Sequence, residues 1–260
     1  MPGDAQVWRD WSGVPRAYGY TLDGDHWIRL PELGSFRFTL GGEWVEAWVP
    51  EPIPRRDVEE AFRRHVLRFV LQARGHELLH ASAVAMPSGA IAFCGSSGVG
   101  KSTLAYGFSR RGHPPIADDA LLFEQVGGTV RVFPLPFMLH LSGESALSGR
   151  GRKAPVNLDP QIVADGPREA SLQLAALFVL EPSVEADPPI PEIVALRNAS
   201  AFLLLLYHAH CFSFRDERRV RLMADRYLQL AATVPTFRLR YRRDIDRLPE
   251  LLDAVERELG

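Results

Sequence analysis

A run of glycine, serine and lysine in the first half of the chain carries the clearest chemical signal. Residues 95–102 are Gly-Ser-Ser-Gly-Val-Gly-Lys-Ser, which is a glycine, four free positions and then Gly-Lys-Ser. In such a loop the glycines let backbone N–H groups point at phosphate oxygens, the lysine reaches the β- and γ-phosphates, and the serine hydroxyl holds Mg²⁺. With glycine at about 7 % of residues, this pattern arises by chance in roughly 1 % of chains this long. The run therefore predicts a phosphate-binding loop (P-loop) rather than an ordinary turn.

The segments around the loop have the properties that a nucleoside triphosphate site of this kind requires. Residues 90–94 are a short apolar run that fits a buried strand ending at Gly95. Residues 102–111 fit a helix with an apolar face and with Gly112 at its C-terminal end. A helix beginning at Ser102 places its positive end at the anion. The residues expected to bind the nucleotide are Gly95, Ser96, Ser97, Gly98, Val99, Gly100, Lys101, Ser102 and Thr103.

Two adjacent carboxylates follow one strand–loop–helix unit after the loop begins. Asp118 and Asp119 lie 17 and 18 positions after Lys101, where the chain has returned to the sheet. Because neighbouring residues of an extended strand point in opposite directions, one aspartate can face the metal and the other the incoming nucleophile. The alternative is a solvated turn or a helix cap, and the spacing from the P-loop favours the functional interpretation.

Other polar residues can reach the same centre. His80 stands in an otherwise apolar strand, predicted at 78–85, next to the strand that leads into the P-loop. A buried core histidine is the alternative interpretation. Residues 142–160 show little periodicity and predict a loop. Its Arg150, Arg152 and Lys153 can close over a transferred phosphoryl group or stay solvated, and the sequence favours neither.

Four short motifs together resemble the catalytic domain of the HPr kinase/phosphorylase family. They span about 40 residues and are His80-Ala81-Ser82, the P-loop, Arg111-Gly112-His113 and Asp118-Asp119. In that family a histidine lies 15 residues before the first P-loop glycine, as His80 does before Gly95. The resemblance implies an α/β fold, a P-loop domain of the HPr kinase and phosphoenolpyruvate carboxykinase type. It also implies an enzyme that phosphorylates a serine hydroxyl with ATP and Mg²⁺.

On this resemblance each site residue takes a role in phosphoryl transfer, which asks a protein mainly for positioning and charge neutralisation. Lys101 and the loop amides hold the β- and γ-phosphates, and Ser102 with Asp119 holds Mg²⁺. Asp118 accepts the proton of the attacking hydroxyl. His80 orients Asp118 or contacts the phosphate.

Outside these motifs the chain departs from the family. A short β unit at 18–49 stands in place of the usual N-terminal domain, and the later Pro-Gly-Arg-Asn segment does not occur. In this the chain is similar to divergent HPr-kinase-related proteins, some of which accompany ribosomally made peptides. In lasso-peptide pathways the acceptor is the C-terminal serine of the precursor peptide, and residues 234–244 are also similar to that subgroup. The departures leave HPr itself and a phosphorylase reaction open.

We therefore expect a serine kinase acting on a peptide or small protein. One alternative is a P-loop kinase of a small metabolite, which would share the same nucleotide-binding half. The other alternative is a non-catalytic ATP-binding regulatory protein. Two aspartates and His80 beside the loop argue against that last alternative, because nucleotide binding alone needs no base.

The composition limits the partners and the compartment. The 260 residues carry a formal net charge of −2, so we expect no nucleic-acid partner. Cys94 and Cys211 are far apart, which favours reduced thiols in a cytoplasmic protein. The N-terminus lacks the apolar stretch of a signal peptide. The apolar residues 201–207 are too few to cross a bilayer and predict a buried helix. We expect no membrane partner, and a homo-oligomer stays possible.

The rest of the pattern predicts the elements that must position this site. Alternating and aromatic residues at 18–49, with turn signals at Asp23-Gly24 and Gly41-Gly42, predict a small antiparallel β unit. Asp57 is expected to cap a helix at 58–74. We expect a domain of residues 1–54 and a P-loop domain of residues 55–260. Further strands are predicted at 90–94, 120–126, 129–133, 174–180 and 236–241, helices at 199–210, 216–233 and 248–259, and a loop at 182–191.

Overall fold

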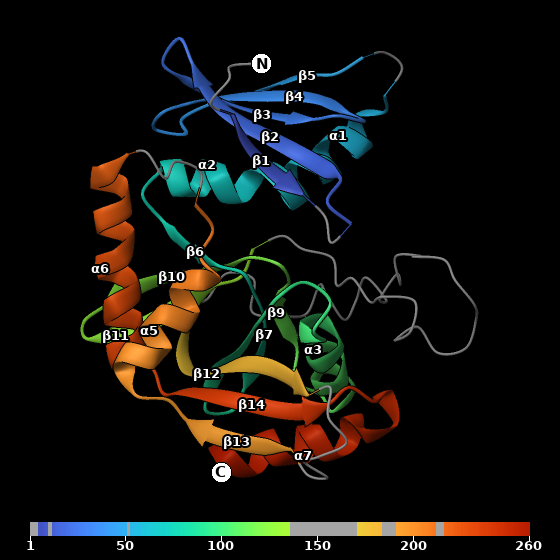
Figure 1. Cartoon of the computed structure of the whole chain (residues 1–260), viewed down its shortest axis with the longest axis vertical. Helices are drawn as coiled ribbons and strands as arrows, with labels where there is room; N and C mark the ends of the chain where they lie inside the picture. The colour runs from blue at the N-terminus through green and yellow to red at the C-terminus, as the bar shows by residue number, and fades with distance from the viewer. Residues whose placement is uncertain (1–4, 10–11, 51–52, 136–170, 184–190, 212–215) are drawn as a thin grey trace. The chain divides into compact units, whose positions relative to one another are not determined.

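The computed structural model describes residues 5–9, 12–50, 53–135, 171–183, 191–211 and 216–260 (Figure 1). By its packing the chain divides into two units. The N-terminal unit comprises Met1–Leu78 and His210–Val220, and the loop-bearing unit comprises Leu79–Ala209 and Arg221–Gly260. Of the helices in the described part of the chain, none combines the length and apolar character that crossing a membrane would require.

An antiparallel meander forms the sheet of the N-terminal unit. Its strands lie in the order β1-β2-β3-β4-β5, with the bounds β1 Gln6–Arg9, β2 Pro15–Leu22, β3 Asp25–Leu30, β4 Gly34–Thr39 and β5 Val45–Trp48. Asp23 and Gly24 between β2 and β3 have φ values of 52° and 83°, as a tight hairpin turn requires. Ile28, Phe36 and Phe38 are fully or almost fully buried on one face. The predicted antiparallel β unit is confirmed.

A helical segment covers the apolar face of this sheet. It consists of α1 (Arg55–Ala61), a π-helical turn η1 (Phe62–Val66) and α2 (Leu67–Ala73). Five apolar residues of this segment pack into the same core as the strands, and they are Val58, Phe62, Val66, Phe69 and Val70. Because of this packing the boundary between the units lies at Leu78, which differs from the boundary at residue 54 that the sequence predicted. The helix also begins earlier than predicted, at Arg55 after an extended Pro54, so Asp57 lies in its first turn instead of capping it.

A mixed sheet forms the centre of the loop-bearing unit. Strands follow one another in the order β10-β11-β12-β8-β7-β9, and β14 pairs with β12 and β13. Their bounds are β7 Ala81–Met86, β8 Gly89–Cys94, β9 Pro115–Ala117, β10 Leu121–Val126, β11 Thr129–Phe133, β12 Leu172–Ser183, β13 Glu192–Ala195 and β14 Thr236–Arg242, while β6 (Glu77–Leu79) lies at the boundary between the units. Strands β8, β12 and β14 are parallel, and β7 is antiparallel to β8 and β9. The strands predicted at 90–94, 120–126, 129–133, 174–180 and 236–241 are confirmed, and β13 was not predicted.

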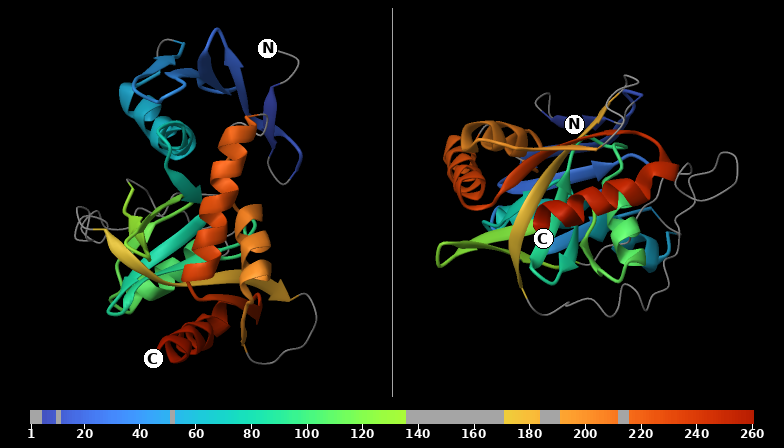
Figure 2. Two further views of the ribbon diagram at one scale, coloured as in Figure 1. Left: turned by 90° about the vertical axis from the view of Figure 1, so that its left-hand side faces the viewer. Right: turned by 90° about the horizontal axis from the view of Figure 1, so that it is seen from below.

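Helices α3 and α7 pack on one face of this sheet (Figure 2). The helices of this part of the chain are α3 Lys101–Arg110, α5 Asn198–Tyr207, α6 Glu217–Thr233 and α7 Leu248–Leu259, with a 3₁₀ turn η2 at Ile245–Arg247. The mixed α/β architecture with a small antiparallel sheet agrees with the predicted fold class. One detail is wrong: the apolar helix at 201–207 is not wholly buried. Leu203 and Tyr207 of α5 are 66 % and 78 % exposed, because only one face of that helix packs.

Candidate functional site

The carboxyl ends of parallel strands meet at one edge of the mixed sheet. Strand β8 ends at Cys94, directly before the glycine-rich loop, and Val179 of β12 pairs with Cys94. Pro182 of β12 pairs with Tyr241 near the end of β14. In Figure 1 the arrowheads of β12 and β14 point the same way, toward the side where α3 lies. In open α/β sheets, ligands bind at the carboxyl ends of the strands.

The antiparallel strands add polar residues to the same edge. His80 directly precedes β7, and Asp118 and Asp119 directly follow β9. Ala81 pairs with Cys94, so His80 lies just beyond β7 on the side of Gly95, the first glycine of the loop. Ala83 pairs with Ala117, and the neighbouring Ser82 donates a hydrogen bond to Asp118. Residues from three strands of one sheet therefore gather at the loop. The strand predicted at 78–85 is interrupted at His80, which lies in a bend between β6 and β7.

The loop between β8 and α3 has a backbone that glycine adopts most easily. Gly98 and Gly100 have φ values of 82° and 107°. Gly100 is the N-cap of α3, whose first residue is Lys101. Ser96 and Ser97 are exposed at the rim of the loop. The predicted order of strand, loop and helix is confirmed, with the helix beginning one residue earlier than expected.

Lys101 is the cation of the loop. Its side chain is buried, and Nζ donates hydrogen bonds to the carbonyl oxygens of Gly95 at 3.0 Å and Ser96 at 3.1 Å. Burial lowers the pKa of Lys101 below its ordinary value, and the nearby charges of Asp119, Cys94 and Asp118 oppose that shift. A buried ammonium held by neutral carbonyls gains much from a charged hydrogen-bond acceptor. The arrangement therefore favours an anion in the loop.

The two aspartates have different partners. Asp118 is buried, and its Oδ1 accepts hydrogen bonds from Ser102 Oγ at 2.8 Å and from Ser82 Oγ at 2.5 Å. The side chain of Asp119 is 45 % exposed, and its Oδ1 lies 3.6 Å from His80 Nε2. The sequence predicted other pairings, with Asp119 beside Ser102 and with His80 either orienting Asp118 or contacting the phosphate. The difference arises because β9 ends at Ala117 and the backbone of Asp119 turns to a φ of 64°, so simple strand alternation does not apply.

Two further residues at this site were not predicted to act there. Ser82 belongs to a motif that was recognised, but its hydrogen bond to Asp118 depends on the register of β7 and β9. His208 lies 128 positions after His80, and its carbonyl accepts the backbone N–H of His80 at 2.8 Å. Burial, followed by the charges of His80 and Lys101, lowers the pKa of His208 to about 4. No local sequence pattern indicates that His208 belongs to this site, because it lies near His80 only in the folded chain.

The Arg111-Gly112-His113 motif supports the helix behind the loop. Arg111 forms ion pairs of 2.7 Å with both Glu256 and Asp253 of α7, and His113 Nε2 lies 3.8 Å from Glu256. These contacts tie the end of α3 to α7. Arg150, Arg152 and Lys153 lie outside the described residues.

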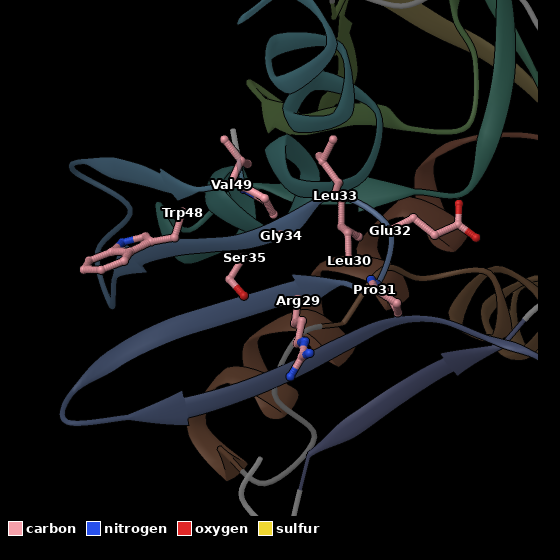
Figure 3. A pocket seen from close by; sticks show the side chains of 10 residues that line it. Arg29, Leu30, Pro31, Glu32, Leu33, Gly34, Ser35, Trp48 and Val49 are labelled. Atoms are coloured by element: carbon pink, nitrogen blue, oxygen red, sulfur yellow. The ribbon is translucent and has the colours of Figure 1, made fainter. Parts of the chain in front are cut away.

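A hollow of about 420 Å³ in the N-terminal unit contains none of the predicted site residues. It is lined by the turn between β3 and β4 and by the end of β5. In Figure 3 the side chains of Arg29, Glu32 and Trp48 point in different directions. Because its polar groups do not converge, we assign no site to this hollow.

Comparisons with known proteins do not establish a family for this chain. No family model matches the chain, and no curated protein matches it. Among solved structures the chain is similar to the Hpr(Ser) kinase/phosphatase from Coxiella burnetii, with 14 % identity, covering 70 % of this chain and 90 % of that chain at a TM-score of 0.38. A likeness at that TM-score decides neither fold nor function.

Proposed function

We propose that the protein is an ATP- and Mg²⁺-dependent phosphotransferase that phosphorylates a serine of a peptide or small protein, such as a ribosomally made precursor peptide. The observation that carries this proposal is the separation of the two aspartates beside the glycine-rich loop. Asp118 binds Ser102, whereas Asp119 lies beside His80 with half of its side chain open to solvent. Serine as the acceptor is supported by the resemblance of residues 80–119 to HPr kinases.

The loop and Lys101 would bind the phosphates. Lys101 Nζ already crosses the loop to Gly95 and Ser96, so a small movement would bring the amine to the β- and γ-phosphate oxygens. Backbone N–H groups of the loop and of the first turn of α3 would supply the remaining contacts. Binding would exchange neutral carbonyl partners of a buried ammonium for charged ones.

Ser102 and Asp118 fit a Mg²⁺ ion carried by the nucleotide. This ion prefers oxygen ligands, keeps several waters, and takes one or two protein ligands beside the substrate phosphates. The Ser102 hydroxyl and the Asp118 carboxylate form such an oxygen pair. When bound, the ion would neutralise charge on the β- and γ-phosphates. Ser82 holds Asp118 in place from the opposite strand.

Asp119 would act as the general base, which reverses the roles that the sequence predicted. Its carboxylate takes the proton of the acceptor hydroxyl, and the acceptor oxygen attacks the γ-phosphorus. The bond from that phosphorus to the β–γ bridging oxygen then breaks, and ADP leaves with the electron pair. His80 Nε2, at 3.6 Å, holds the orientation of the Asp119 carboxylate.

The test compares Asp119→Asn with Asp118→Asn, using labelled ATP, a panel of serine-containing peptides and mass spectrometry of the products. Asp119→Asn should lower the rate of transfer by about 10²–10⁴-fold with ATP still bound, the usual contribution of a general base. Asp118→Asn should instead raise the Mg²⁺ concentration needed for half-maximal rate.

The matched pair also defines what would overturn the proposal. If Asp118→Asn removed transfer at every Mg²⁺ concentration while Asp119→Asn kept a near-native rate, the base would be Asp118. Transfer only to a free sugar, amino acid or nucleoside would replace the peptide acceptor with a small metabolite. ATP binding without transfer to any acceptor would indicate a regulatory protein.

A further inference from the structure

A tyrosine from β14 contacts the glycine-rich loop. The hydroxyl of Tyr241 donates a hydrogen bond to the carbonyl oxygen of Val99. The ring is buried in the core that α3 and α7 cover, at the strand edge where β8 and β12 end. Burial raises the pKa of Tyr241 to about 12, so the hydroxyl keeps its proton and remains a donor throughout the physiological pH range.

This contact fixes one peptide group of the loop. In a trans peptide the C=O and the following N–H lie in one plane and point in opposite directions. When the Val99 carbonyl is held toward Tyr241, the N–H of Gly100 must therefore point away from Tyr241. Among the described residues this N–H has no hydrogen-bond partner. It is a donor that a ligand can use.

The presence of glycine at position 100 does not by itself determine the orientation of the Val99–Gly100 peptide. Gly100 has a φ of 107°, which glycine allows but does not prefer over negative φ values. A flip of the Val99–Gly100 peptide would exchange the two groups and present the carbonyl oxygen to an incoming phosphate. Two oxygens that carry negative charge repel each other, so the flipped loop would bind the anion less well. A specific contact must select the productive orientation.

We propose that Tyr241 is a positioning residue of the loop, whose hydroxyl holds the Val99–Gly100 peptide so that the Gly100 N–H donates to a phosphate of the nucleotide. This inference rests on the phosphate-binding function proposed above. Tyr241 itself does not touch the reacting atoms. It acts through the loop backbone.

Tyr241→Phe tests the proposal because it removes one oxygen and keeps the buried ring. Calorimetric titration with ATP–Mg²⁺ and with inorganic tripolyphosphate should give affinities reduced roughly 3- to 10-fold, the effect of one neutral hydrogen bond. Tyr227→Phe is the matched control, since Tyr227 is a fully buried tyrosine that packs against Phe123 in the same unit. It should leave both affinities unchanged.

Two further measurements separate positioning from a general loss of structure. In the ligand-free protein, the amide signal of Gly100 in nuclear magnetic resonance spectra should broaden or split in Tyr241→Phe, as the peptide samples both orientations. Tyr241→4-aminophenylalanine keeps an N–H donor and should restore the affinity. If Tyr241→Phe does not fold, Tyr241→4-fluorophenylalanine fills the place of the oxygen without donating a proton.

The outcomes distinguish this inference from the proposed function. If the wild type binds both probes and the variants without a donor bind them equally well, Tyr241 does not position the loop, and the proposed function stands. If the wild type binds neither ATP nor tripolyphosphate, the proposed function fails and this inference fails with it. A loss that 4-aminophenylalanine does not restore would show a packing effect and overturn the positioning role.

Discussion

The buried polar side chains of the two units differ in how their hydrogen-bond partners are arranged. In the N-terminal unit the buried Glu77 and Gln72 each have a partner in the same unit: Arg219 donates to both carboxylate oxygens of Glu77, at 2.7 Å and 2.9 Å, and Gln72 donates to the carbonyl of His210. In the loop-bearing unit most of the buried polar side chains surround the glycine-rich loop, and they are Ser82, Lys101, Asp118 and His208. There the partners are shared, since one oxygen of Asp118 accepts from two hydroxyls.

Under the proposed function, this difference separates polar groups that stabilise the fold from polar groups that bind the nucleotide. The Glu77–Arg219 ion pair brings two opposite charges together inside the protein, although Nε of Arg219 has no hydrogen-bond partner among the described residues, so loss of the pair should affect stability. Nζ of Lys101 donates to carbonyl oxygens of its own loop, which carry no full charge, so under the proposed function its removal should affect binding. Three substitution experiments test this contrast.

The largest expected effect is on stability in the N-terminal unit. Glu77→Gln should lower the free energy of unfolding by about 3–5 kcal/mol, because the mostly buried guanidinium of Arg219 loses its carboxylate. Urea denaturation measures this change. Glu59→Gln is the control, since the Arg55–Glu59 pair is exposed and contributes about 0.5 kcal/mol or less. Equal effects of the two substitutions would contradict the structural role of the Glu77 pair.

The next largest effect is on binding in the loop-bearing unit. Lys101→Met keeps the apolar stem and should lower the affinity for ATP–Mg²⁺ by about 10- to 100-fold, the loss of charged hydrogen bonds. The free energy of unfolding should stay the same or rise, because the folded protein no longer buries that charge. Titration calorimetry and urea denaturation give the two values, with Arg110→Met on the exposed side of α3 as the control. A destabilisation as large as that of Glu77→Gln would make Lys101 structural.

A third expected effect is a pH dependence of stability that both units share. Burial lowers the pKa of His26 in one unit and of His208 in the other to about 4, from an ordinary value of 6.5. Between pH 6.5 and 4 the unfolded chain therefore binds more protons, so stability should fall as the pH is lowered through this window and level off below it. His26→Gln and His208→Gln should each flatten the curve of unfolding free energy against pH. If the curve of either variant runs parallel to that of the wild type, the histidine replaced in that variant does not cause the pH dependence.

Local patterns in the sequence were sufficient to predict most of the helices and strands and the glycine-rich loop. Gly98 and Gly100, placed between an apolar strand and a helix, have the left-handed backbone that such a loop requires. Asp23-Gly24 forms the predicted hairpin turn for the same reason. Structural features that depend on a few neighbouring residues can therefore be predicted from the sequence.

Contacts between distant segments were not predictable in the same way. The exchange of partners between Asp118 and Asp119 depends on where β9 ends and on one backbone angle, which no residue type specifies. His208 reaches the loop because the chain after α5 forms a bridge between Ala209 and Leu79. In each case the outcome is set by the fold and not by the local sequence.

The backbone of Asp119 has a consequence for how this protein can be evolved in the laboratory. Among the described residues only Asp23 and Asp119 combine a positive φ with a side chain, and Asp119 is not in a hairpin that requires it. Glycine at that position would relieve strain on the order of 1 kcal/mol. A selection for heat resistance alone would therefore favour glycine there and discard the carboxylate. If Asp119 is the general base, as proposed, the glycine variant would lose activity, so variants would have to be selected for turnover as well.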